Sequence, residues 1–287
     1  MKRKIWRVIA CALCVVMLSG QAVMADSVDN SDVYVSLGAD LSSKERATVL
    51  RLLGIDNIDD YNVDYITNEQ EHEYLDDYLE KSVIGSRALS SVIVKPGDNG
   101  INVETYNITF CTSGMYRNAL ATAGMENAEV TVAGPFNISG TAALVGAMKA
   151  YESMTGEKVS EEQLDAANQE LVVTGEVADT IGEDEAEQLI AMVKEKVAAD
   201  NLDSAQEIGE VIDEAANQLN VNLSEEDRQK IEDLMQKISD LDLNVDQLRE
   251  QAKDIYNKLE DMGLTLDEGF FTRLKNWFLS LIDRIFG

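Results

Sequence analysis

The chain has 287 residues and a formal net charge of −29 at pH 7, and 45% of its residues are hydrophobic. That hydrophobic content is enough to bury a sizeable core, which excludes general disorder. The strong negative charge repels nucleic acid and anionic lipid headgroups, so we expect no nucleic-acid partner.

The first 25 residues have the pattern of a secretory signal peptide. Four cations among residues 2–7 precede an uncharged apolar run at 8–18, which is the order of the charged and apolar regions of such peptides. The small residues up to Ala25 predict cleavage between Ala25 and Asp26. An uncleaved anchor helix is the alternative, but the run is shorter than the ~20 apolar residues that span a bilayer core. We therefore expect a secreted or extracytoplasmic protein.

Cleavage would remove 25 residues and four cations, so that 262 residues with a formal charge of −33 and one cysteine, Cys111, would remain. An intramolecular disulfide is then impossible, and the fold has to be held by its core alone. That combination fits an exported bacterial protein better than a small disulfide-stapled domain.

The remaining chain divides near Gly156 into regions of different pattern. Residues 26–156 alternate strand-like runs with helical stretches, which is typical of a mixed α/β domain. Residues 157–267 contain no proline and read as an acidic helical domain, and residues 268–287 read as an amphipathic C-terminal helix. The sequence thus predicts the α+β class, with a mixed α/β N-terminal domain followed by an all-α, bundle-like region.

In the first region, capping boxes at Ser42 and Thr67 open two helices, and runs of β-branched residues indicate strands. The expected elements, in chain order, are a strand at 33–37, helices at 43–53 and from 68, strands at 91–95 and 103–110, a helix at 116–123, a strand at 129–133 and a helix at 141–154. The two strands that flank the turn at 96–100 read as a hairpin.

In the second region, apolar residues recur at three- and four-residue steps. The expected helices are 183–199, 204–219, 224–241, 246–262 and 268–286. Ser224, Asp246 and Asp267 stand where N-caps are wanted, and their spacing of 22 and 21 residues suggests a series of helix hairpins. We expect an antiparallel bundle rather than a repeat array.

Familiar catalytic and metal-binding arrangements are missing from the sequence. A zinc-protease helix needs imidazoles at i and i+4, and the single histidine, His72, is followed at that spacing by Asp76, so we expect a surface histidine. Cys111 and His72 could form a nucleophile–base pair, but a lone cysteine ending a β-rich run is typically a small buried apolar residue. We assign no catalytic residue, no metal ligand and no cofactor.

Carboxylate chemistry stays open. The chain has 53 acidic residues, and their number makes any chosen catalytic pair uninformative. The run at 240–244 starts like a calcium loop, but Val245 stands where glycine is required and Gln251 where glutamate is required. We interpret it as a polar helix junction.

The segment at 134–141 is a candidate ligand loop because it lies between an expected strand and an expected helix start. Asn137, Ser139, Gly140 and Thr141 are its candidate residues. A helix N-terminus after a glycine-containing loop offers free backbone N–H groups to a ligand oxygen. The spacing and the lysine of a phosphate-binding P-loop are missing, so we expect self-capping of the helix by Ser139 or Thr141, with ligand binding as the alternative.

The last expected helix has an aromatic face and a basic face. Local charge is reversed there, with three cations against two acids. The apolar face comprises Phe270, Phe271, Leu274, Trp277, Phe278, Leu281, Ile282 and Ile285. Such a helix either lies in a membrane interface or packs on the bundle or a partner, and the sequence leaves both open.

Four runs carry a family resemblance: YITNEQEHEYL from Tyr65, IGSRALSSVIV from Ile84, MYRNALATAG from Met115 and VAGPFNISGTAALVGAMKAYE from Val132. In this order they resemble the YpuA-like family of exported proteins from Gram-positive bacteria, a domain family of unknown function. The resemblance covers nearly the whole chain after the signal peptide. It implies an exported protein of bacterial source and supplies no activity or catalytic residues.

We therefore expect an exported, non-enzymatic cell-envelope protein. Its α/β domain would bind an unidentified envelope protein or polymer. Its helical part would position it, with peripheral contact to the outer face of the cytoplasmic membrane through the C-terminal helix. The alternative is a cell-wall-polymer hydrolase, or another extracellular enzyme, that uses carboxylates or Cys111.

Overall fold

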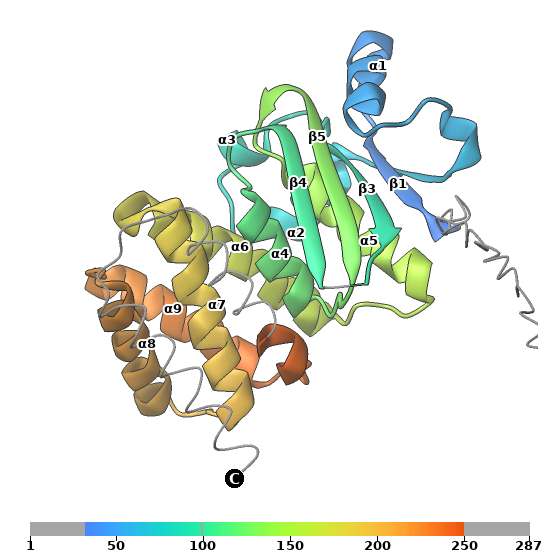
Figure 1. The fold of residues 1–287 in the computed structure, drawn as a ribbon. Helices are drawn as coiled ribbons and strands as arrows, with labels where there is room; N and C mark the ends of the chain where they lie inside the picture. The colour runs from blue at the N-terminus through green and yellow to red at the C-terminus, as the bar shows by residue number, and fades with distance from the viewer. Residues whose placement is uncertain (1–31, 99, 250–287) are drawn as a thin grey trace, which may run out of the picture.

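The computed structural model describes residues 32–98 and 100–249 (Figure 1). The expected signal peptide, its cleavage site at Ala25 and Asp26, and the expected helix at 268–287 lie outside these residues and stay predictions. Within the described ranges, no helix is both long and apolar enough to cross a bilayer.

The strands of the described residues form one mixed sheet with the order β2-β1-β3-β5-β4. β1 is parallel to β2, β4 is parallel to β5, and β3 runs antiparallel to both β1 and β5. The strands are β1 Tyr34–Gly38, β2 Asn62–Ile66, β3 Ser91–Pro96, β4 Ile101–Ile108 and β5 Ala128–Ile138.

The predicted hairpin of β3 and β4 is wrong, because β5 lies between these two strands (Figure 1). β5 buries Val130, Val132 and Ala133 and takes an inner position in the sheet. β4 alternates exposed residues with less exposed ones and forms an edge of the sheet. The turn at 96–100 therefore connects strands that are two positions apart.

Helices begin where a side-chain oxygen can cap them. The capping boxes predicted at Ser42 and Thr67 are confirmed, and Ser224 caps its helix as expected. The helices are α1 Ser43–Leu52, η2 Ile58–Asp60, α2 Asn68–Leu75, α3 Lys81–Ile84, α4 Ser113–Thr122, α5 Thr141–Thr155, α6 Glu161–Ile181, α7 Glu183–Asp200, α8 Ala205–Leu219 and α9 Glu225–Ser239.

The predicted N-cap at Asp246 is wrong, because the chain is already helical from Val245. Asn244 caps this helix instead, and the N–H of Gln247 donates to its Oδ1 at 3.2 Å. The larger part of the helix expected at 246–262 lies beyond the described residues.

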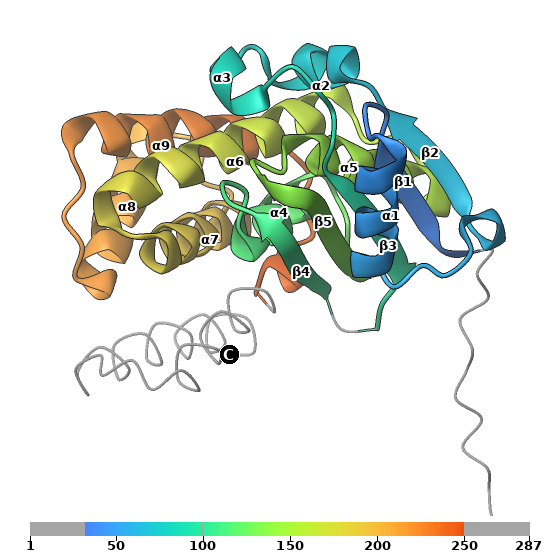
Figure 2. The same ribbon diagram turned by 90° about the horizontal axis from the view of Figure 1, so that it is seen from above.

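Helices cover both faces of the sheet (Figure 2). α1 packs on one face and encloses a small core with Val35, Leu37 and Ile93. α4 and α5 pack on the other face and enclose the larger core. α5 approaches β1 closely at Gly146, where an added Cβ would lie 2.8 Å from the Cβ of Ser36.

The helical region continues the larger core on the far side of α4 (Figures 1 and 2). α6 packs on α4, α7 and α9 pack on α6, and α8 packs on α7 and α9. The sheet followed by successive helices confirms the α+β class. The division near Gly156 stays a prediction, since one buried cluster includes residues from both sides of it.

A buried polar network joins α4, α6 and α7. The ammonium of Lys194 donates to Glu170 Oε1 at 2.7 Å, to Thr122 Oγ1 at 3.1 Å and to the carbonyl of Asn118 at 2.9 Å. Glu170 is 0% exposed and Lys194 is 1% exposed. Burial raises the pKa of Glu170 and lowers that of Lys194, so each group depends on the other to remain charged.

Candidate functional site

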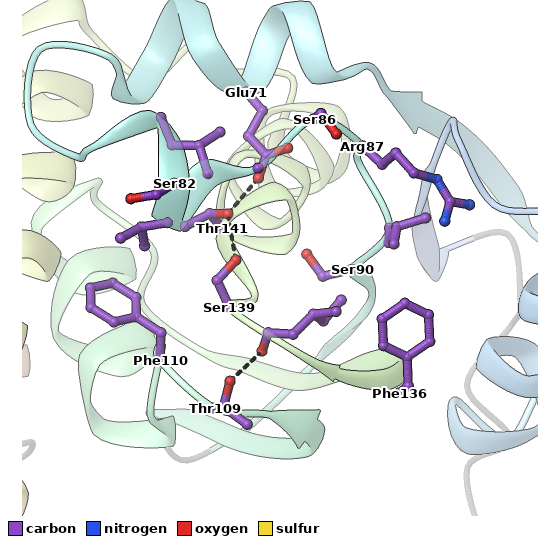
Figure 3. A pocket seen from close by; sticks show the side chains of 15 residues that line it. Glu71, Ser82, Ser86, Arg87, Ser90, Thr109, Phe110, Phe136, Ser139 and Thr141 are labelled. Carbon is purple, nitrogen blue, oxygen red and sulfur yellow. Dashed lines mark hydrogen bonds between the residues drawn. The ribbon is translucent and has the colours of Figure 1, made fainter.

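A pocket of about 500 Å³ lies where β4 and β5 end and α5 begins (Figure 3). Parallel strands bring their carboxyl ends to the same edge of a sheet, and ligands of α/β sheets commonly bind at that edge. The segment from α3 to the start of β3 forms the facing wall. Its hydroxyl-bearing residues are Ser82, Ser86, Ser90, Thr109, Ser139 and Thr141, and its larger apolar residues are Val83, Ile84, Leu89, Phe110, Phe136 and Ile138.

A bulge in β5 brings Phe136 to the pocket. Ala133 pairs with Tyr106 and Ile138 pairs with Ile108, so residues 134–137 of β5 lie opposite Asn107 alone. Asn107 has a φ of 59° and donates its side-chain amide to the carbonyl of Gly134 at 3.0 Å. The bulge carries Phe136 out of the strand, and its side chain is 50% exposed.

Glycine is required at position 134 by this bulge. An added Cβ would lie 2.7 Å from the carbonyl oxygen of Phe136 and 2.9 Å from that of Asn107. Pro135, which follows, has no N–H to leave unpaired in the interrupted ladder. The Gly134–Pro135 pair thus fits the local backbone that displays Phe136.

The N-terminus of α5 forms the floor of the pocket and is capped from other elements. Gly140 precedes the helix with a φ of 101° and makes no side-chain cap. Thr141 Oγ1 donates to the Glu71 carboxyl group from α2, and the N–H of Ala143 donates to Ser90 Oγ at 2.9 Å. The backbone of Ala142 also donates to Glu71. The self-capping predicted for Ser139 or Thr141 is therefore wrong, because Glu71 of α2 and Ser90, just before β3, supply the capping oxygens.

Glu71 is the acidic group of the pocket and is 2% exposed. Burial raises the pKa of its carboxyl group, while hydrogen bonds from Thr141, Asn68 and the backbone of Ala142 lower it in part. Figure 3 shows Glu71, Thr141 and Ser139 in one hydrogen-bonded chain, in which the Ser139 and Thr141 hydroxyls lie 3.2 Å apart. The acid is thus held by the protein's own donors.

Arg87 lies at the pocket rim with its guanidinium engaged elsewhere. Its two terminal nitrogens donate to the Glu45 carboxylate at 3.1 and 2.7 Å, and one of them also donates to the carbonyl of Asp40 at 2.7 Å. The hydrogen bonds from Arg87, together with those from Ser42, lower the pKa of Glu45 to about 2. The guanidinium therefore anchors the pocket wall to α1.

His72 supports the same wall from α2. Its Nε2 donates to the carbonyl of Gly85 at 3.1 Å, and its Nδ1 lies 2.6 Å from Asp76 Oδ1. The hydrogen bond to Asp76 raises the pKa of His72. The predicted surface position is confirmed in part, since the side chain is 25% exposed and holds a residue that lines the pocket.

Cys111 is a buried residue behind the loop, as the sequence predicts, and it is 1% exposed. Burial raises the pKa of its thiol, which disfavours a thiolate nucleophile. Its N–H donates to the carbonyl of Ser139 at 3.0 Å, and Tyr116 donates its hydroxyl to the carbonyl of Gly140. Cys111 and Tyr116 thus hold the loop that precedes α5.

Of the four candidate loop residues, Ser139 and Thr141 line the pocket. Gly140 turns the chain into α5, and Asn137 is an exposed residue of the β5 bulge. The sequence did not single out Glu71, Arg87 or Phe110, because their roles depend on contacts between distant elements. Phe136 has a local signal in the sequence. It is an aromatic residue that stands between Pro135 and Asn137, which are turn-forming residue types.

Metal ligands do not cluster in the described part of the chain, where no group of three or more His, Cys, Asp or Glu side chains is placed to hold an ion. The run at 240–244, which starts like a calcium loop, follows the C-terminus of α9. It contributes Asn244 as the cap of the next helix, so our interpretation as a helix junction is confirmed.

Comparison with known proteins identifies the family. A family model described as "Protein of unknown function (DUF1002)" matches residues 37–255. The chain is 38% identical to the "Uncharacterized protein YpuA" of Bacillus subtilis (strain 168), over 99% of this chain and 98% of that protein. No solved structure matches the fold. The chain therefore belongs to this family of proteins of unknown function.

Proposed function

We propose that the protein is an exported, non-enzymatic component of the cell envelope that binds an envelope molecule in the pocket at the ends of β4 and β5. One observation carries this proposal. Three of the four sequence runs that carry the family resemblance supply 11 of the 15 residues that line the pocket. The runs that carry the resemblance thus supply most of the pocket lining.

The side chains of the pocket favour binding over catalysis. A nucleophile needs a proton acceptor within hydrogen-bond reach, but the thiol of Cys111 is buried and Glu71 already accepts from Thr141 and Asn68. Glu71 is the single carboxyl group among the lining residues, whereas glycoside hydrolysis ordinarily uses two.

The proposal for export rests on the sequence of the first 25 residues and on the fold. Cys111 is the one cysteine after Ala25 and is a free, buried residue, so the fold needs no disulfide and no protection from disulfide exchange.

Binding to isolated cell envelopes tests this function. The chain from Asp26 should sediment with envelopes, and Phe136→Ser should reduce the bound fraction because it removes the exposed ring of the pocket. Tyr106→Ser is the matched control, since Tyr106 is a 40% exposed aromatic residue of β4 that does not line the pocket. Equal binding by the two variants would contradict the proposal.

A second candidate function is hydrolysis of a wall polymer with Glu71 as the acid. The observation in its favour is a buried carboxyl group with a raised pKa in a pocket, which is a common feature of catalytic acids. Purified protein would then release soluble fragments from cell walls, and Glu71→Gln, but not Cys111→Ala, would abolish the release. No release by the unaltered protein would eliminate this candidate.

A further inference from the structure

We propose that the ligand of this pocket is a neutral sugar, bound as part of an envelope glycan. This inference rests on the proposed binding function and adds the chemical class of the ligand. It comes from the charges, hydroxyl groups and aromatic rings of the pocket.

An anionic ligand has no vacant position at the floor of the pocket. The N-terminus of α5 would suit an anion because of its free N–H groups and helix dipole. Glu71 already occupies that position, where it accepts from the Thr141 hydroxyl and the backbone of Ala142. A phosphate or carboxylate would meet this carboxyl group at close range.

Neither charged side chain of the pocket, Arg87 or Glu71, is available to bind a charged ligand. Arg87 is held by both oxygens of Glu45 and by the carbonyl of Asp40, so it offers no vacant fork to an anion. A cationic ligand would have to take Glu71 from its internal donors. The chain's formal charge of −29 further opposes anions. The pocket is therefore suited to an uncharged ligand.

The remaining polar groups match a polyhydroxylated ligand. Each serine or threonine hydroxyl can both donate and accept a hydrogen bond, as sugar hydroxyls also do. Six such residues line the pocket. Ser82, Ser90, Thr109, Ser139 and Thr141 already form hydrogen bonds within the protein. A hydroxyl group has one donor and two acceptor lone pairs, so it can take a further partner. A neutral ligand with many hydroxyl groups can use this capacity without any charge.

Two phenylalanine rings provide the aromatic part of the site. Phe110 and Phe136 come from β4's end and from the β5 bulge, and Figure 3 shows them on opposite sides of the pocket. Aromatic faces carry partial negative charge and attract the polarised C–H groups on the flat face of a sugar ring. The volume of about 500 Å³ falls within the range of small-molecule sites and has room for a short oligosaccharide.

Titration calorimetry with defined probes tests the ligand class. The chain from Asp26 is titrated with neutral tetramers of glucose and of N-acetylglucosamine, with a galacturonate trimer, and with inorganic phosphate. We expect at least one neutral tetramer to bind, Phe136→Ser to weaken it by roughly tenfold or more, and Thr109→Val to weaken it less. Tyr106→Ser should bind like the unaltered chain. Urea unfolding of each variant verifies that it is folded.

The outcomes separate the ligand class from the binding function. If the galacturonate or phosphate binds in a Phe136-dependent manner and the neutral tetramers do not, the ligand is anionic and the inference fails while the pocket stays a binding site. If no probe binds but Phe136→Ser still reduces envelope binding, the ligand is of another class and the inference is again wrong. If Phe136→Ser changes neither measurement, the proposed function fails as well.

Discussion

Glu195 on α7 is a fully buried carboxyl group, and neither of its oxygens has a hydrogen-bond partner among the described residues. The nearest cation is Arg249, whose Nε lies 3.6 Å from Glu195 Oε1. Burial raises the pKa of Glu195 to about 7, while Arg249 and Lys196 lower it and Asp200 raises it further. The group is therefore mostly protonated in the folded chain below about pH 7.

The free energy of unfolding should fall as pH rises from about 4.5 to about 7, because the unfolded chain releases this proton first. Protonated Glu195 contributes about 3 kcal/mol to the free energy of unfolding. This contribution is fully present below pH 4.5, the pKa of the unfolded chain, and is lost above about pH 7, the pKa of the folded chain. Glu195→Gln should remove it and make the variant more stable than the unaltered chain at about pH 8. Urea unfolding of both proteins at several pH values measures this, and a stability difference that does not change with pH would contradict it.

Gly140 has the backbone conformation and the spacing that exclude a side chain. Its φ is 101°, and an added Cβ would lie 2.6 Å from Tyr116 Oη and 2.7 Å from Ile108 Cγ2. Gly140→Ala should lower the free energy of unfolding by about 3 kcal/mol or more, as strain and overpacking combine. Gly156→Ala is the control, since its φ is 72° but an added Cβ meets nothing within 4 Å. Gly156→Ala should lower the free energy of unfolding by about 1 kcal/mol. Equal losses of unfolding free energy for the two variants in urea would show that the contacts at Gly140 do not matter.

The buried ion pair between Glu170 of α6 and Lys194 of α7 predicts how these two helices depend on each other for stability. Lys194→Met removes the cation that keeps Glu170 charged in the core, which should cost about 3–5 kcal/mol of stability. The double substitution Lys194→Met with Glu170→Leu should restore a large part of that loss. Lys230→Met serves as the control, because Lys230 pairs with Glu176 and Glu226 at the surface and should cost less than about 1 kcal/mol. A double variant no more stable than Lys194→Met would contradict this view of the pair.

Elements with a strong local signal are predictable from the sequence. The capping boxes at Ser42 and Thr67 mark two helices, and α7, α8 and α9 follow from their apolar periodicity. α6 was missed despite a capping box formed by Ser160 and Gln163. β2 was missed because it is an edge strand in which only Ile66 is buried. The pairing of β3 with β5 is a contact between distant residues, so adjacent strands gave the wrong hairpin.

The candidate site is likewise predictable from the sequence only where its signal is local. The segment at 134–141 is recognisable from its glycines and its place before a helix, and Ser139 and Thr141 do line the pocket. Glu71 lies 70 residues from Thr141 in the sequence, and Arg87 lies 42 residues from Glu45. No local pattern indicates such pairs, because the sheet and α5 bring them together only in the folded chain.

At the scale of the whole molecule, the first 25 residues are proposed to direct export, and the segment at 268–287 is proposed to retain the protein at the membrane. A chain truncated after Asp267 should shift from the membrane fraction to the soluble fraction, because it loses the aromatic and basic faces of the expected helix. Substitution of Arg273 and Lys275 by Ser in the full chain separates the charge contribution from the apolar one. Identical partitioning of the full and truncated chains would contradict the retention role.

The most direct test of the pocket is photo-crosslinking in living cells, with a photoreactive amino acid in place of Phe136 in one strain and in place of Tyr106 in another. Our account predicts that position 136 captures an envelope molecule that carries a glycan, and that the product decreases when a binding neutral oligosaccharide is added. Position 106 should give no such product. Capture of the same molecules at both positions, or of none at position 136, would contradict the assignment of this pocket as the binding site.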